Sequence, residues 1–145
     1  MILRPAVAAL CLFATTLPAA AQDICAPLLD FIGHARGGTS PVPWSGAEAC
    51  ATATSESGAQ EVYCYWSHPL RDPAAAQAAK TLTADIRTCL PGVQVLPADQ
   101  PVNHPDSYDL RRFRAGDLIV SLAVKDKAAL GQTLVFLRAQ LQSPD

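Results

Sequence analysis

Cysteines constrain this chain more than any other residue type, because each pairing ties distant segments together. Four of the five cysteines, Cys25, Cys50, Cys64 and Cys89, lie beyond the apolar N-terminal segment. Zinc ligands usually come in pairs two to four residues apart, and no two of these cysteines are that close. We therefore interpret them as two disulfides, the usual role of an even cysteine count in an exported chain. The missing C-x-x-C pair also argues against a thioredoxin-like oxidoreductase.

The N-terminal segment predicts export. Residues 1–21 combine the positive charge of Arg4, an apolar run over 6–17 and small residues up to Ala21, which are the three regions of a cleavable signal peptide. The run is shorter than the roughly 20 residues that span a bilayer, so we expect no membrane anchor in the mature chain. Cleavage after Ala21 removes Cys11 and leaves the other four in the periplasm or an extracellular space. The short alanine-rich signal favours a bacterial source.

We expect residues 22–145 to form a single globular domain, and the composition of the whole chain limits its function classes. Half of the residues are hydrophobic, which argues against disorder. Eleven Lys and Arg residues against 13 Asp and Glu residues give a net charge of −2. This weak acidity argues against nucleic acid as a partner. No motif indicates a cofactor or a metal, so we expect neither.

Two segments have helical periodicity. In the first, apolar residues recur at helical spacing over 25–35, and Gly37 follows as a stop. In the second, Asp72 is a predicted N-cap, Pro73 takes the first helical position, and the helix ends near Leu90.

The remaining ordered segments are strand-like and are joined by short polar turns. They comprise a hairpin (Ala49–Thr54 with Gln60–Ser67), a short strand (93–96) and a C-terminal meander (108–114, 117–124 and 133–139), with a polar connection at 125–127. This order predicts an α+β domain of two layers. Its sheet is mostly antiparallel, built from the hairpin and the meander, and packs against the two helices.

The hairpin also bears on the cysteines. If it turns about Ser57, Cys50 lies opposite Cys64 across the two strands. Cys25 and Cys89 would then tie the first helix to the end of the second. The two other pairings of four cysteines stay open, because connectivity does not follow from sequence alone.

A polar loop at 103–109 holds the candidate catalytic groups His104, Asp106 and Asp109. A serine-type or histidine-type hydrolase needs such groups to converge through tertiary structure, and sequence neighbours in one loop seldom do. A proline-bounded turn with side chains capping backbone amides is the alternative. The three histidines stand alone in sequence, so we expect no metal site.

Two sets of residues are candidate binding groups. Arg112 and Arg114 are two apart in a strand and so project from one face. They either keep a charged sheet face from pairing with other strands, with nearby acids diluting their field, or bind an anionic partner. Tyr63 and Tyr65 face away from Cys64 and suit either an interface or cross-strand packing.

The sequence therefore favours a non-enzymatic module that binds another envelope or secreted protein, as an adaptor or an inhibitor-like protein. One alternative is a small secreted hydrolase that uses His104 and Asp106. Another is a structural component of an envelope assembly. A homodimer formed through an edge strand fits each of these possibilities.

Overall fold

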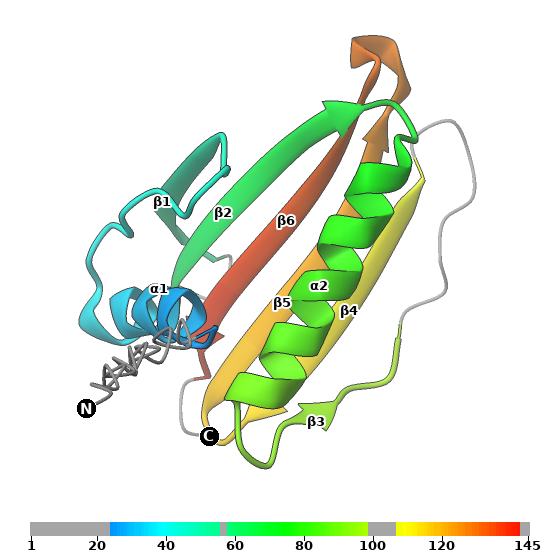
Figure 1. Cartoon of the computed structure of the whole chain (residues 1–145). Coiled ribbons are helices and arrows are strands. Elements are labelled where there is room, and N and C mark those ends of the chain that lie inside the picture. Colours follow the sequence, from blue (N-terminus) through cyan, green and yellow to red (C-terminus); the bar gives the residue numbers. More distant parts are fainter. Residues whose placement is uncertain (1–23, 56–57, 99–106, 143–145) are drawn as a thin grey trace, which may run out of the picture.

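The computed structural model describes residues 24–55, 58–98 and 107–142, so the predicted signal segment and the 103–106 part of the candidate catalytic loop lie outside it. Two α-helices, six strands and one 3₁₀ helix follow each other along these residues (Figure 1). In chain order they are α1 (Ala26–Gly37), β1 (Ala49–Thr54), β2 (Gln60–Pro69), α2 (Pro73–Cys89), β3 (Gln94–Val95), β4 (Tyr108–Ala115), β5 (Leu118–Lys127), η1 (Ala128–Leu130) and β6 (Gln132–Leu141).

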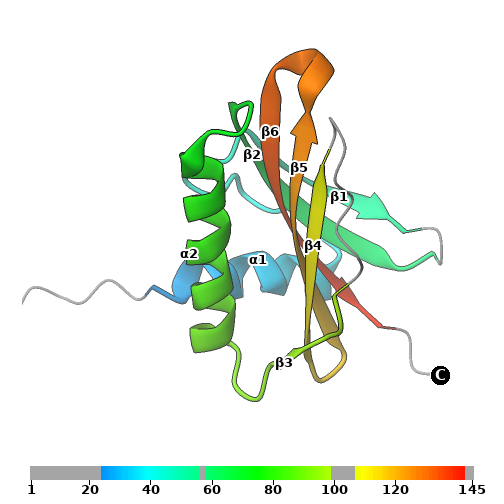
Figure 2. The same cartoon turned by 90° about the vertical axis from the view of Figure 1, so that its right-hand side faces the viewer.

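The strands form one antiparallel sheet in the order β1-β2-β6-β5-β4-β3. β6 pairs with both β2 and β5, so the hairpin and the C-terminal meander become parts of a single sheet. Both helices cover the same face (Figures 1 and 2), with α1 against β2 and β6 and α2 against β5 and β6. The predicted α+β domain of two layers is confirmed.

Capping residues determine where the helices begin and end. The Asp72 carboxylate accepts a hydrogen bond of 2.8 Å from the Ala74 amide, and Pro73 begins α2. Gly38 ends α1 in the left-handed conformation, with φ 62°. One stripe of α2 is buried on the sheet, and its members are Ala75, Ala79, Leu82, Ile86 and Cys89. The small alanines let this helix approach the strands closely.

Alternation along the strands separates a core face from a free face. In β5 the side chains of Leu118, Val120 and Leu122 are buried against the helices. Cross-strand partners continue this core in β6, where Val135 and Leu137 are fully buried. Neither described helix packs on the other face of the sheet.

The predicted polar turn at 125–127 is wrong, because β5 continues to Lys127 and turns through η1 instead. Polarity predicted a turn there, but the Asp126 side chain lies inside the fold, only 5% exposed. It accepts hydrogen bonds from Thr133 Oγ1 at 2.7 Å, Ser107 Oγ at 2.8 Å and Arg71 Nε at 3.0 Å. A buried carboxylate is tolerated in this strand because three hydrogen-bond donors stabilise its negative charge.

This polar cluster also connects distant segments. Thr133 Oγ1 accepts a hydrogen bond of 2.7 Å from the Arg71 amide, and the Gly131 carbonyl accepts one of 2.9 Å from the Leu70 amide. Both bonds fix the turn between β2 and α2 onto the β5–β6 end of the sheet. Arg71 holds a left-handed conformation there, with φ 58°, which these bonds stabilise.

Two disulfides hold the elements together. Cys50 lies opposite Cys64 in the β1–β2 hairpin, with 4.1 Å between their Cα atoms. Cys25 and Cys89 join the residue before α1 to the last residue of α2, with 5.3 Å between their Cα atoms. These are the two pairings to which the hairpin turn pointed. Disulfides indicate an oxidising, exported environment.

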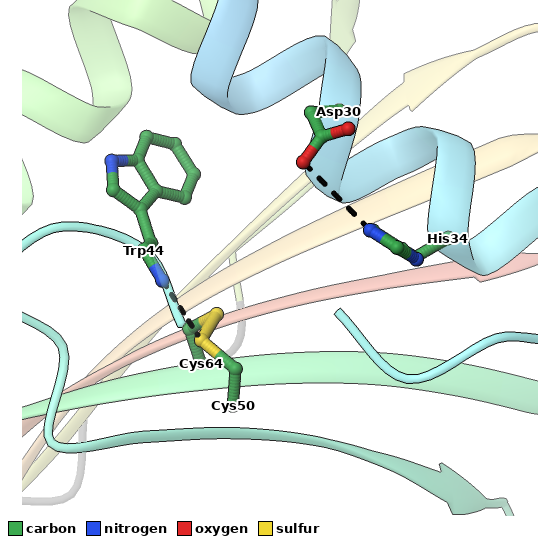
Figure 3. Close-up of a disulfide and its surroundings, with 5 residues drawn as sticks. All are labelled: Asp30, His34, Trp44, Cys50 and Cys64. Atoms are coloured by element: carbon green, nitrogen blue, oxygen red, sulfur yellow. Dashed lines mark hydrogen bonds and ion pairs between the residues drawn. A yellow bond between two sulfur atoms is a disulfide. The ribbon is translucent and has the colours of Figure 1, made fainter. Parts of the chain in front are cut away.

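Trp44 packs beside the hairpin disulfide under α1. Its amide donates to Cys50 Sγ at 3.5 Å (Figure 3), and its ring centroid lies 6.1 Å from that of Phe31 and 5.9 Å from that of Trp66. The loop before β1 therefore folds back onto the core through this one large side chain. Neither helix in the described residues has the length and apolar character needed to cross a membrane.

Loss of either disulfide should destabilise the fold, and the effect should be larger for the disulfide that closes the longer loop. In the chain-entropy account, the bridge spanning 64 residues contributes about 4 kcal/mol and the bridge spanning 14 contributes about 3 kcal/mol. We therefore expect the C25S/C89S variant to unfold at lower urea concentration than C50S/C64S, and both at lower concentration than wild type. Equal midpoints for wild type and either variant would contradict this role.

Replacing Asp126 with asparagine should lower the free energy of unfolding at pH 7 by about 2–4 kcal/mol, because the amide offers one acceptor oxygen instead of two to the three donors and removes the charge that pairs with Arg71. The D109N variant is a matched control. Asp109 makes an exposed ion pair of 3.3 Å with Arg111, whose loss costs no more than about 0.5 kcal/mol. Urea unfolding of both variants measures the difference.

The Asp126 effect should depend on pH. Hydrogen bonds from Thr133, Arg71 and Ser107 and the Arg71 charge lower the pKa of Asp126 against the opposing effect of burial. A carboxylate whose pKa is lower in the folded state stabilises the fold above its unfolded pKa, about 3.9. That contribution disappears as pH falls through the folded pKa. The stability gap between wild type and D126N should therefore narrow below about pH 4, whereas a constant gap would exclude an ionised Asp126.

Candidate functional site

The face of the sheet opposite α1 and α2 gathers most of the unassigned polar and aromatic side chains. We call it the helix-free face, and it comprises the strand residues that alternate with the buried core positions. The β1–β2 hairpin leans away from the helices, so the sheet curves around this face (Figure 2). Twist of this kind is intrinsic to β-sheets. It makes the helix-free face concave.

Cross-strand register organises the helix-free face into rows. One row, which we call the polar row, runs from Tyr63 of β2 through Arg138 of β6 and Ser121 of β5 to Arg112 of β4. Both of its outer members were predicted from sequence as binding residues. The pairing of β2 with β6 brings them onto one surface.

The adjacent row is apolar. It runs from Tyr65 through Phe136 and Ala123 to Leu110. The Tyr65 and Phe136 rings lie 5.6 Å apart between centroids, a cross-strand aromatic contact. Ala123 is the smallest member and lies between two large side chains, so the sheet surface is recessed at this point.

A hollow of about 570 Å³ opens over these rows. Its size falls within the range of about 300–1,000 Å³ that is typical of ligand pockets. Side chains from four strands line it: Glu61, Tyr108, Leu110, Ser121, Ala123, Lys125, Lys127, Phe136, Arg138 and Gln140.

Positive charge is concentrated on this face. Five of the 11 Lys and Arg residues of the chain project from it: Arg112, Arg114, Lys125, Lys127 and Arg138. Among the strand residues that the structure describes, Glu61 is the one acidic residue that the register places here. Its carboxylate lies 3.7 Å from Arg138 Nη1.

Two of the cations lie over aromatic rings. Lys125 Nζ is 5.9 Å from the centre of the Tyr108 ring, and the Arg138 guanidinium is 5.9 Å from the centre of the Phe136 ring. Both distances are within the range of cation–π attraction. Aliphatic stems and rings therefore cover part of the sheet while the charged groups stay near solvent.

The acids that would dilute this charge lie elsewhere. Asp109 is on the helix side of β4 and pairs with Arg111 at 3.3 Å. Asp117 lies in the β4–β5 turn and pairs with Arg36 of α1 at 3.2 Å. Asp106 lies outside the described residues. Both described acids thus pair with arginines that lie off the helix-free face.

The candidate catalytic loop is only partly visible, since His104 and Asp106 fall in the part that the structure does not describe. Asp109 follows them but is exposed on the face opposite the hollow. Within residues 24–55, 58–98 and 107–142, no three His, Cys, Asp or Glu side chains come together as a metal site.

Sequence reasoning missed the centre of the site. It placed Lys125 and Lys127 in a turn, and it did not single out Phe136 or Arg138. The signal that could have placed the lysines is the alternation of side chains between the two faces of a strand, although polar and apolar residues do not themselves alternate strictly along β5 or β6. Extending that alternation past Val124 places both lysines beside Ala123 on one face.

The arrangement suits binding, since it offers fixed cations around a recessed aromatic surface. No protein-family model matches the chain, and a search of curated proteins likewise found no match. The charge and shape of the helix-free face are therefore the features from which a function can be inferred.

Proposed function

We propose that the protein is an exported binding module whose helix-free face recognises an acidic segment of another exported protein. The observation that carries the proposal is the concentration of five cations and four aromatic rings on a concave face that holds a single described strand carboxylate. The rings are Tyr63, Tyr65, Tyr108 and Phe136. The two disulfides fit an extracytoplasmic partner, and the predicted signal peptide supports a bacterial envelope.

The charge on this face is local, because the whole chain has a net charge of −2. The helix-free face therefore carries a positive excess that the rest of the chain more than offsets. Such a surface attracts an acidic partner, orients it and raises the rate of association. Glu61 is only 12% exposed and sits beside Arg138, so it sets the position of that guanidinium more than it repels an anion.

The aromatic rings favour a protein segment over a plain polyanion. A sulfated glycan or a lipid headgroup needs cations alone, whereas Tyr, Phe and Arg together are the side chains enriched at protein interfaces. Tyr65, Phe136 and Leu110 form a half-buried apolar row beside the cations. A partner that carries both carboxylates and apolar side chains would satisfy both parts of the surface.

Removal of the cations should weaken binding of an acidic polypeptide. We expect the K125S/K127S and R112S/R114S variants to bind immobilised poly-L-glutamate at least about tenfold less tightly than wild type, or about 1.4 kcal/mol. Surface plasmon resonance at 50 and 200 mM salt measures the loss.

The matched control removes the same charge from another surface. Lys80 and Arg87 are both exposed on α2, and the K80S/R87S variant should bind poly-L-glutamate like wild type. Equal losses of affinity in all three variants would mean that binding depends only on the net charge of the protein. Tight binding to heparin or to phosphatidylglycerol vesicles, with none to poly-L-glutamate, would reject a protein partner.

A further inference from the structure

The hollow on the helix-free face has an apolar recess next to its cations, so it selects for more than negative charge. Its apolar recess lies where Ala123 is flanked by Phe136 on β6 and Leu110 on β4. Ala123 is 7% exposed, so its methyl group forms the base and the two larger side chains form the walls. A recess of this kind accepts an apolar or aromatic side chain.

Two cations follow this recess along β5 itself. On β5 the next residue on the same face is Lys125, followed by Lys127. Because a strand rises about 3.3–3.4 Å per residue, these positions lie about 7 and 14 Å from Ala123. Both lysines line the hollow.

In the opposite direction β5 itself carries no cation on this face, and the cations lie on the neighbouring strands, Arg138 on β6 and Arg112 on β4. Ser121 follows Ala123 there and pairs with Arg138, whose guanidinium already has the Glu61 carboxylate at 3.7 Å. An incoming carboxylate at that end would meet Glu61 as well as Arg138. The lysine end carries two cations that face Leu134 and Gln132 across the strands, neither of them acidic.

We infer, on the basis of the proposed function, that the hollow recognises an extended peptide with an aromatic residue and acidic residues at the second and fourth positions from it. In an extended chain, alternate side chains share a face and are spaced like those of a strand. With the aromatic side chain over Ala123, the two carboxylates lie over Lys125 and Lys127. The partner segment is thus defined by spacing as well as by charge.

Three labelled nonapeptides test this spacing. The first, Gly-Ser-Phe-Thr-Glu-Thr-Glu-Ser-Gly, places glutamates at the second and fourth positions after phenylalanine. The second has the same composition with the glutamates at the first and third positions, Gly-Ser-Phe-Glu-Thr-Glu-Thr-Ser-Gly. The third replaces phenylalanine of the first with serine. Fluorescence anisotropy at 50 mM salt measures their affinity for the full mature chain.

We expect wild type to bind the first peptide at least about tenfold more tightly than either of the others. The K125S/K127S variant should lose most of this affinity. The A123L variant, which fills the recess and leaves every charge in place, should bind the first and third peptides equally. K80S/R87S should behave as wild type.

The outcomes separate this inference from the proposed function. Equal binding of all three peptides that still requires Lys125 and Lys127 would overturn the spacing rule and leave the acidic-partner function in place. No binding of any peptide, or of poly-L-glutamate, would overturn both. Because the peptide comparison uses wild type alone, it decides the question even if A123L does not fold.

Discussion

The pairing of β2 with β6 sets the geometry on which the rest of the domain depends. It joins segments about 70 residues apart in sequence and places β6 between the hairpin and the meander. A slip of one residue in this pairing would turn every side chain of one half to the opposite face. Cys64 opposite Leu137 fixes a core position, and Tyr65 opposite Phe136 fixes the aromatic contact on the other face. One register thus builds the core and the candidate site together.

Both disulfides and both helices act on the same side of this sheet. Cys25–Cys89 connects the start of α1 to the end of α2, and Cys50–Cys64 lies on the core side of the hairpin beside Trp44. The covered face therefore contains most of the buried apolar side chains and both covalent bridges. The second face has no layer over it among the described residues (Figure 2). Such an uncovered sheet face needs polar side chains, or a partner, to be stable in water.

Local sequence signals predicted the helices and the hairpin. Features that depend on contacts between residues distant in sequence could not be predicted in this way. Asp72, Pro73 and Gly38 mark helix ends through backbone chemistry that depends only on neighbours. The hairpin turn places Cys50 opposite Cys64 for the same reason. The course of β5 past Val124 depends on Asp126 meeting Thr133 and Arg71, which are distant in sequence and invisible to a local pattern. The β2–β6 register is equally non-local, so Tyr63 and Arg112 were named separately although they end one row.

Charged residues on an open sheet face also prevent aggregation, but that function needs a different arrangement of charges from the one that binds an acidic partner. Protection against strand addition works best when both signs are mixed and no large field of one sign develops. Here Asp109 and Asp117 pair with Arg111 and Arg36, away from the hollow. Lys125, Lys127 and Arg138 line the hollow together with Glu61, and Arg112 and Arg114 lie on the same face of the sheet. Solubility alone does not require one face to be poor in acidic residues. Recognition of an acidic partner does, because each carboxylate on that face would compete with those of the partner.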